Sequence, residues 1–359
     1  MTPQIIAHRG ASYLAPENTL TAFKKAMELG ADGVEMDVQQ TSDAGLVIHH
    51  DYMIDLHTDI SGKIYDMTMG DLKTLDFGSW KDVLFKDEKI ATLQEAMELC
   101  RQMPGCTVHL ELKSTMDNDP DFVPRVLEVL QQTEMVEQVI LVSFNHALLR
   151  QAKQLLPELR VGALVYGELE SMLLPPPIIW KDLGLTNGME DDMEAMDAAL
   201  PTTDADEENC SWMTRWMTDK VSMLRASFPG ESLNEIYKNL MAQLDLPAYI
   251  RSLDFVPEWV SCEYHTAYKN AGFIDKLHEM GIKVSLWTVD TEDSVRSLLR
   301  TSADAYITNR PDRVREWMEK EQAATAPAEE TPAEVTPAEP APAAEADAGT
   351  AAAESASLE

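Results

Sequence analysis

Short apolar segments with strand character alternate with amphipathic helical segments along most of this 359-residue chain. Residues 4–8 form the first such strand, and residues 20–29 form the first such helix, with apolar side chains at helical spacing. Continuous apolar strands separated by helices are typical of a parallel sheet buried on both faces. The strands are expected to begin near residues 4, 33, 46, 106, 139, 161, 259, 283 and 305. This number favours an α/β fold of the (β/α)8 type, the TIM barrel, over an open doubly wound sheet.

Two segments interrupt the alternation. Residues 51–90 contain turns and short helical pieces, and we interpret them as a small insertion after the early strands. Residues 167–256 are too long for a connection and contain eight of the chain's 20 Met residues, so we interpret them as an inserted, mostly helical subdomain. The barrel with both insertions is expected to span residues 1–320. Residues 321–359 are rich in Ala, Pro and Glu, lack Lys and Arg, and are expected to form a disordered tail.

Charge and cysteine content limit the partners. The formal net charge is −33 and no basic stripe is visible, which argues against binding of nucleic acid. The four cysteines lack metal-ligand spacing and are expected to be reduced, although Cys100 and Cys106 are near enough in sequence to form a disulfide. No apolar run is long enough to span a bilayer and no leader pattern opens the chain, so a cytoplasmic protein without a transmembrane segment is expected. The oligomeric state cannot be derived from the sequence.

Carboxylates gather at the predicted strand ends. Glu35 and Asp37 share one face of the strand at residues 33–38, because side chains alternate along a strand. Two such carboxylates repel one another unless a cation compensates them; the alternative is a strand end in solvent. Glu111 lies near the end of another strand, and the C-terminal ends of barrel strands meet at one mouth, where active sites form. The three are therefore candidate metal ligands, and an all-carboxylate set favours Mg²⁺ or Ca²⁺ over Zn²⁺.

Cationic and imidazole side chains fall at the same predicted strand ends. Arg9 and Lys113 supply the positive charge that a phosphoryl group requires. His8 and His50 each follow a short apolar strand, and two imidazoles near a metal can act as general base and general acid of a displacement at phosphorus. His109 is expected to contact the metal ligands, and the other five histidines are expected to be structural.

These residues occur in an order that resembles the glycerophosphodiester phosphodiesterase family. The resemblance covers roughly residues 4–166 and 257–318. It rests on His8-Arg9-Gly10, Pro16-Glu17-Asn18-Thr19, Glu35-x-Asp37, His50-Asp51, Glu111-Leu112-Lys113, Trp287-Thr288-Val289 and Thr308-Asn309-Arg310-Pro311. The turn at residues 42–45 is one residue longer than the family's usual turn, which is expected to leave the register of the next strand intact.

The resemblance implies metal-dependent hydrolysis of glycerophosphodiesters to sn-glycerol 3-phosphate and an alcohol, on a (β/α)8 barrel. In this family the glycerol hydroxyl beside the phosphoester attacks phosphorus, and water then opens a cyclic phosphate. By position in the motifs, the implied roles are metal binding for Glu35, Asp37 and Glu111, acid–base catalysis for His8 and His50, phosphate binding for Arg9 and Lys113, and substrate contact for Trp287 and Phe144. Which histidine is the base is left open at this point.

Two alternatives remain beside this hypothesis. The Met- and Trp-rich residues 167–256 could form a lid over an acyl chain, which would give lysophospholipase D-like hydrolysis of an acylated glycerophosphodiester. A self-packed surface subdomain is the simpler interpretation of that segment. The second alternative is a phosphate-binding protein without catalysis, which the intact set of charged residues disfavours.

Overall fold

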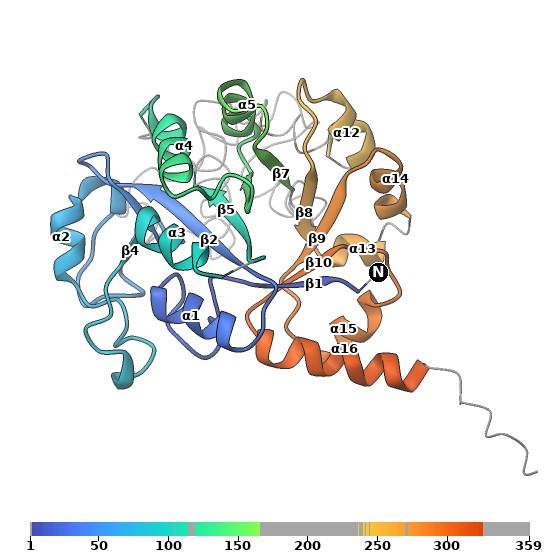
Figure 1. Ribbon diagram of the computed structural model, residues 1–359, viewed down its shortest axis with the longest axis horizontal. Coiled ribbons are helices and arrows are strands. Elements are labelled where there is room, and N and C mark those ends of the chain that lie inside the picture. Colours follow the sequence, from blue (N-terminus) through green and yellow to red (C-terminus); the bar gives the residue numbers. More distant parts are fainter. Residues whose placement is uncertain are drawn as a thin grey trace, which may run out of the picture.

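The computed structural model describes residues 2–103, 105–113, 119–165, 236, 240, 242–243, 245–269 and 272–325. Eight parallel strands in this part of the chain form a closed barrel (Figure 1). They are β1 (Gln4–Ala7), β2 (Gly33–Gln40), β5 (Thr107–Leu112), β6 (Val139–Ser143), β7 (Arg160–Val165), β8 (Trp259–Glu263), β9 (Lys283–Trp287) and β10 (Ala305–Thr308).

The first strand closes the barrel. β1 pairs in parallel with β10, where Ala7 is opposite Thr308, and also with β2, where Ala7 is opposite Val34. The remaining strands follow one another in sequence order around the ring, as short right-handed crossovers require. The predicted (β/α)8 barrel is therefore confirmed, with eight strands in the ring and not nine.

Helices connect the strands and form the outer layer (Figure 1). Thr19 caps the first helix by accepting a hydrogen bond from the Ala22 amide, and Thr92 with Glu95 forms a capping box that starts the third. The helices of the ring are α1 (Leu20–Glu28), α3 (Leu93–Arg101), α4 (Phe122–Gln132), α5 (His146–Leu155), α12 (Leu246–Ser252), α13 (His265–Lys269), α14 (Phe273–Glu279), α15 (Glu292–Leu298) and α16 (Pro311–Thr325).

The prediction of a barrel strand near residue 46 was wrong. β3 (Leu46–Ile48) runs antiparallel to β2, with Gln40 opposite Leu46 and Val38 opposite Ile48. It is the return arm of a hairpin that begins where β2 extends beyond the ring. A run of apolar residues looks the same in either strand direction, so the pattern could not reveal the reversal. The longer turn at residues 41–45 leaves the pairing on both sides of it in register, as expected.

The small insertion builds outward from this hairpin. β4 (Ala91–Thr92) pairs with β3, and short helical pieces lie between them: η1 (Ile64–Asp66), α2 (Met69–Thr74) and η2 (Val83–Phe85). Its own apolar cluster contains Val47, Ile54, Ile64, Leu72, Phe77 and Ile90. The insertion can therefore vary around this local core without contributing to closure of the barrel.

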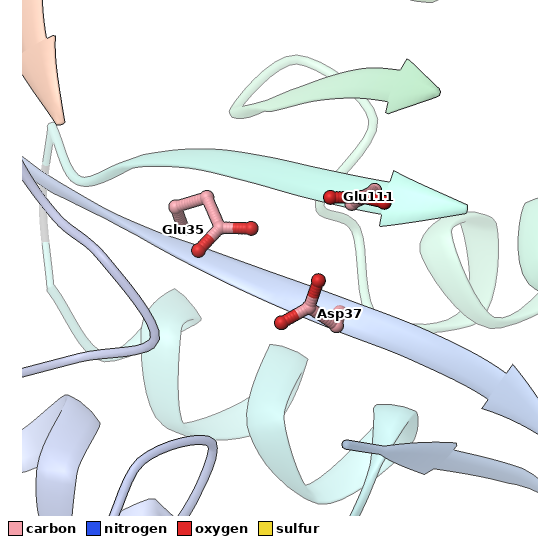
Figure 2. Close-up of side chains that lie close together, drawn as sticks. All are labelled: Glu35, Asp37 and Glu111. Carbon is pink, nitrogen blue, oxygen red and sulfur yellow. The ribbon is translucent and has the colours of Figure 1, made fainter. Parts of the chain in front are cut away.

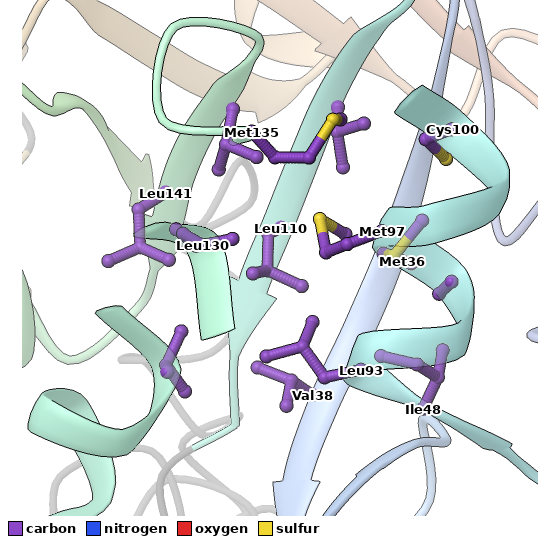
Figure 3. Packing of buried hydrophobic residues seen from close by; sticks show 14 of the residues in the cluster. Met36, Val38, Ile48, Leu93, Met97, Cys100, Leu110, Leu130, Met135 and Leu141 are labelled. Atoms are coloured by element: carbon purple, nitrogen blue, oxygen red, sulfur yellow. The ribbon is translucent and has the colours of Figure 1, made fainter. Parts of the chain in front are cut away.

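The core has two layers, one on each face of the strands. Outward-facing Met36, Val38 and Leu110 pack against Leu93 and Met97 of α3 (Figure 3). A smaller inner layer fills the barrel with Ile6, Ile140, Val142, Leu164, Trp259, Ala305 and Ile307. Alternation thus assigns one parity of each strand to the helices and the other to the barrel interior.

In the second half of the chain, α13 and α14 are separate helices, and Gly272 before α14 has a left-handed φ of 89°. α16 continues through Thr325 and so enters the segment assigned to the tail. Residues 326–359 lie outside the described part, as do most of residues 167–256, where the mostly helical subdomain was predicted. Among the described helices, none combines the length and apolar character needed to cross a membrane.

Candidate active site

Three carboxylates from two neighbouring strands meet inside the barrel. Glu35 and Asp37 have the inward parity of β2, and Glu111 has the inward parity of β5, where it lies opposite Asp37 in the pairing. All three are buried, and one oxygen from each lies within 4.8 Å of the others (Figure 2). The structure therefore brings the three predicted metal ligands together in the way that the alternation of β2 required.

The charges in this group are not balanced. Burial alone would raise the pKa of Asp37. The positive charges of Lys113, His50 and Arg9 instead hold the pKa of Asp37 well below its ordinary value. Burial and the neighbouring Asp37 carboxylate raise the pKa of Glu35 well above its ordinary value. Three buried carboxylates beside two cations leave a surplus of negative charge when all are ionised, and oxygen ligands in this number suit a hard divalent cation. The residues present therefore fit a bound divalent metal.

Lys113 and Arg9 lie near different oxygens of Asp37. The Lys113 Nζ is 2.9 Å from Oε1 of Glu111 and 3.2 Å from Oδ1 of Asp37. The Arg9 Nε is 3.6 Å from Oδ2 of Asp37, and its Nη1 donates to Oε1 of Glu17 at 2.7 Å. Burial would lower the pKa of Lys113, but the carboxylates of Glu111 and Asp37 raise it, so the ammonium stays charged. Both cations are thus held at the carboxylate group, as predicted.

The backbone after β1 turns sharply to present Arg9. Arg9 has a φ of 54° and Gly10 a φ of 81°. A Cβ on Gly10 would come within 2.6 Å of the backbone carbon of Ala22 in α1, so only glycine fits there. The Arg9 amide donates to Oε2 of Glu35 at 3.0 Å. The close approach of Gly10 to α1 therefore sets both the Arg9 side chain and one hydrogen bond to a candidate metal ligand.

His8 enters the site from the end of β1. Its Nδ1 is 2.7 Å from Oδ1 of Asn309, and its Nε2 is 3.9 Å from Oε2 of Glu35. Burial and the charge of Arg9 lower the pKa of His8 to about 4, so the ring is neutral at pH 7. A neutral imidazole can accept a proton, which is the property that a general base needs.

His50 reaches the same mouth by another route. It follows β3, whose end lies beside Val38 of β2, so the hairpin returns the chain to the level of Asp37. Its Nδ1 is 2.8 Å from Oδ1 of Asp51, and the hydrogen bond from His50 lowers the pKa of Asp51 to about 2. The predicted convergence of His50 on the site holds, but the expectation that it ends a parallel barrel strand was wrong.

The two predicted aromatic residues lie at the carboxyl ends of β6 and β9. Phe144 follows β6 and Trp287 ends β9, both with inward parity, and their rings meet edge to face at 6.2 Å. They pack on the inner core layer. The Trp287 Nε1 is buried and donates no hydrogen bond to any residue of the described part. Their contact with substrate stays a prediction.

Several residues with a part in the site were not singled out from the sequence. Asn18, which has a left-handed φ of 58°, donates from Nδ2 to Oδ2 of Asp37 at 2.8 Å. His57, expected to be structural, lies 3.9 Å from Glu17 and 3.2 Å from His49. The segment at residues 16–19 carried a usable signal for Glu17 and Asn18, because it directly follows the first strand and turn. His57 gave no such signal, since it comes from the insertion.

His109 has inward parity on β5 and lies opposite Glu35 in the pairing. Neither ring nitrogen has a hydrogen-bond partner among the described residues, and the ring packs edge to face on Trp259 at 5.4 Å. Burial lowers its pKa to about 3, so it is neutral. His109 thus forms part of the floor beneath the carboxylates, without a hydrogen bond to them.

Comparison with known sequences is consistent with this geometry. The model of the glycerophosphoryl diester phosphodiesterase family matches residues 8–174 and 213–313. A glycerophosphodiester phosphodiesterase of Caldanaerobacter subterraneus is 42% identical over 164 residues, which is 46% of this chain and 67% of that protein. One from Bacillus altitudinis is 32% identical over 164 residues, or 45% of this chain and 66% of that protein. The alignments thus span about two thirds of these relatives' own lengths.

Solved structures share the fold. A phosphodiesterase from Oleispira antarctica, in complex with the product sn-glycerol-3-phosphate, gives a TM-score of 0.60 at 24% identity, over 88% of this chain and 97% of that one. A glycerophosphodiester phosphodiesterase from Thermotoga maritima gives 0.52 at 20% identity, over 88% and 98%. At such identities the likeness concerns the fold alone, and it agrees with the barrel described above.

Proposed function

This chain belongs to the glycerophosphoryl diester phosphodiesterase family, and on that premise we propose that it hydrolyses glycerophosphodiesters to sn-glycerol 3-phosphate and an alcohol. The curated relatives are named for this activity, in agreement with the expected class of phosphoric diester hydrolase. The observation that carries the proposal is the buried group of Glu35, Asp37 and Glu111 with two cations and two histidines around it. The product bound to the Oleispira antarctica phosphodiesterase is the compound that this reaction would release.

Glu35, Asp37 and Glu111 would hold a divalent cation. When bound, such an ion lowers the pKa of a substrate hydroxyl and neutralises phosphoryl charge. Mg²⁺ and Ca²⁺ both suit an all-oxygen ligand set, and the choice between them is left to experiment. Arg9 and Lys113 add fixed positive charge beside Asp37, which would orient an anionic phosphodiester and stabilise the charge that develops on it.

His8 and His50 would carry the proton transfers. In the attack of the glycerol hydroxyl on phosphorus, one imidazole takes the hydroxyl proton and the other gives a proton to the departing alcohol. Each has its Nδ1 engaged, by Asn309 and by Asp51 respectively, so the Nε2 atoms remain for the substrate. In the second step the roles reverse as water opens the cyclic phosphate. The two rings hold and return protons, while Arg9 and Lys113 keep the phosphate in place.

A substrate panel tests this proposal. Glycerophosphocholine and glycerophosphoethanolamine are incubated with the full chain in Mg²⁺, in Ca²⁺ and in chelator, and release of glycerol 3-phosphate is measured. Release that depends on the metal and disappears in His8→Ala, with thermal unfolding unchanged, is the expected result. Metal binding without turnover of any diester would favour the non-catalytic alternative.

The same panel addresses the acylated substrate. Turnover of lysophosphatidylcholine, measured beside that of glycerophosphocholine, tests the lysophospholipase D-like alternative. That alternative rests on residues 167–256, most of which lie outside the described part. Equal turnover of both compounds would support a lid over the acyl chain. Turnover of glycerophosphocholine alone would remove that alternative.

A further inference from the structure

The His8 ring is anchored by a residue from the other end of the chain. Oδ1 of Asn309, which follows β10, lies 2.7 Å from Nδ1 of His8 and also accepts a hydrogen bond from the Ser12 hydroxyl at 2.7 Å. The backbone secures this contact, because the His8 amide donates to the Thr308 carbonyl and the Tyr13 amide donates to the Asn309 carbonyl. The Asn309 side chain therefore has little freedom to move relative to His8.

Asp290 decides which way the Asn309 amide faces. Its Oδ2 lies 2.6 Å from Nδ2 of Asn309, while its Oδ1 accepts from the Asn309 backbone amide at 2.8 Å and from the Thr308 hydroxyl at 3.0 Å. An ionised carboxylate only accepts hydrogen bonds, so the atom of Asn309 that faces it must be the NH₂ group. The amide oxygen is then left to face His8, and the usual ambiguity between the two ends of an amide is removed.

The orientation of the amide fixes the proton on the ring. A carbonyl oxygen only accepts, so the Nδ1 of a neutral His8 must carry the proton in order to donate to Oδ1 of Asn309. The Nε2 then carries a lone pair and faces the site, 3.9 Å from Oε2 of Glu35. We propose that Asp290 is a positioning residue that, through the Asn309 amide, holds His8 in the tautomer whose Nε2 is unprotonated and directed at the substrate.

This relay deepens the proposed function and rests on it. In the opening step the O–H bond of the glycerol hydroxyl breaks, its proton passes to Nε2 of His8, and the oxygen pair forms the new bond to phosphorus. The result is an imidazolium with both nitrogens protonated, whose Nδ1–H is already donated to Asn309. The other tautomer would present an N–H to the hydroxyl and could not accept its proton, so the relay keeps His8 in the form that a base needs in that step.

A swap of two side chains offers a sharp test, because Asp and Asn have the same shape. In Asp290→Asn two amides face each other, so the Asn309 amide is free to turn and present its NH₂ to Nδ1. In the double variant Asp290→Asn/Asn309→Asp, the amide oxygen introduced at position 290 can accept from the backbone amide of residue 309 and from the Thr308 hydroxyl. Its NH₂ group can donate to the carboxylate introduced at position 309. That carboxylate again accepts from Nδ1 of His8. The single variant should break the relay and the double variant should restore it.

The readout is the tautomer itself, together with the rate. Long-range proton–nitrogen spectra of the full chain labelled with ¹⁵N-histidine, with the His8 signals identified by their absence in His8→Gln, report which nitrogen is protonated. We expect the Nδ1–H form in the wild type, a mixture in Asp290→Asn, and the Nδ1–H form again in the double variant. kcat should fall at least about 10-fold in the single variant and return to within about threefold in the double variant, with KM changed less than about twofold.

Asp304 provides a matched control at the opposite end of the barrel. It also pairs with a histidine, at 2.8 Å from Nε2 of His278, and Asp304→Asn should leave both kcat and the His8 spectrum unchanged. An unchanged His8 tautomer in Asp290→Asn would overturn the relay, as would a folded double variant that fails to recover it. Because the spectrum needs no substrate, a relay that fails is distinguishable from a chain that does not hydrolyse glycerophosphodiesters.

Discussion

Carboxylates lie at both ends of the barrel, but they are matched with donors at the amino ends of the strands and crowded together at the carboxyl ends. At the amino end the same arrangement occurs three times. An acid just before one strand accepts the amide of a preceding strand at 2.8 Å and pairs with a base on a helix. The three sets are Asp32 with Ile5 and Arg315, Glu258 with Val161 and Lys153, and Asp304 with Val284 and His278.

At the carboxyl end of the barrel, the acids are not matched with partners in this way. Glu35, Asp37 and Glu111 lie within 4.8 Å of one another and outnumber the cations beside them. The amino-end acids satisfy backbone donors and join strand to helix, so they serve stability. The carboxyl-end acids leave charge unbalanced, which costs stability and creates affinity for a cation. A partly exposed acid that is matched with donors does not mark a site, whereas several buried acids without enough partners do.

The largest effect should come from removing one crowded carboxylate. Glu35→Gln keeps the shape and can still accept from the Arg9 amide, but it removes one charge from the metal ligands. We expect kcat to fall by at least about 10³-fold, since both metal binding and charge stabilisation are lost. In chelator, the free energy of unfolding at pH 7 should rise, because the raised pKa of Glu35 shows that its charge is disfavoured. Loss of stability together with activity would contradict the proposed imbalance.

His146, also at the carboxyl end, has hydrogen-bond partners for its neutral ring and should therefore stabilise the fold in a pH-dependent way. His146 is buried, with its ring nitrogens 2.7 Å from the Tyr249 hydroxyl and 2.9 Å from the Leu164 carbonyl, and burial lowers its pKa to about 4. The unfolded chain takes up a proton near pH 6.5 and the folded chain does not. Stability is therefore complete above pH 6.5 and falls as the pH drops towards 4, by about 3 kcal/mol for this group.

Urea unfolding of the wild type and of His146→Gln at pH 6.5 and pH 4.5 measures this contribution. Glutamine can donate to Leu164 and accept from Tyr249 but does not titrate in this range. The decline in the free energy of unfolding should therefore be smaller in the variant by about 2–3 kcal/mol. An equal decline in both proteins would show that His146 is not held neutral.

The smallest effect is expected at the amino end. Asp304→Asn weakens the pair with His278 and the hydrogen bond from the Val284 amide, both of which are partly exposed. The free energy of unfolding should fall by about 1–2 kcal/mol with kcat unchanged, measured by thermal unfolding and by release of glycerol 3-phosphate. A large loss of activity here would break the division between the two ends.

The sequence allowed the barrel and the centre of the site to be predicted because both depend on local periodicity. Parity on β2 and β5 is enough to place Glu35, Asp37 and Glu111 on one face, and strand ends locate His8 and Arg9. The direction of β3 could not be predicted, since a short apolar run has no polarity of its own. The position of His50 at the site was therefore predicted correctly, but from the incorrect assumption that β3 is a parallel strand of the barrel.

The partners of His8 could not be predicted for a different reason. Asn309 is separated from His8 by 301 positions, and Asp290 contacts it from the segment after β9. Only closure of the ring shows that these three side chains meet. Asn309 was visible within a family motif, but its hydrogen bonds depend on distances that no spacing encodes. Asp290 had no signal at all, because an acid after a strand is common in loops.

The pairing of β1 with β10 has a consequence for how the protein is made. In a chain that grows from its N-terminus, β1 is synthesised before the rest of the barrel, yet it lacks one of its two neighbours until residues 305–308 have been synthesised. The Asn309 anchor follows one residue later. His8 is thus synthesised before the other residues of this site and is among the last to be set in place, so shorter nascent chains contain the charged residues without a working arrangement of them.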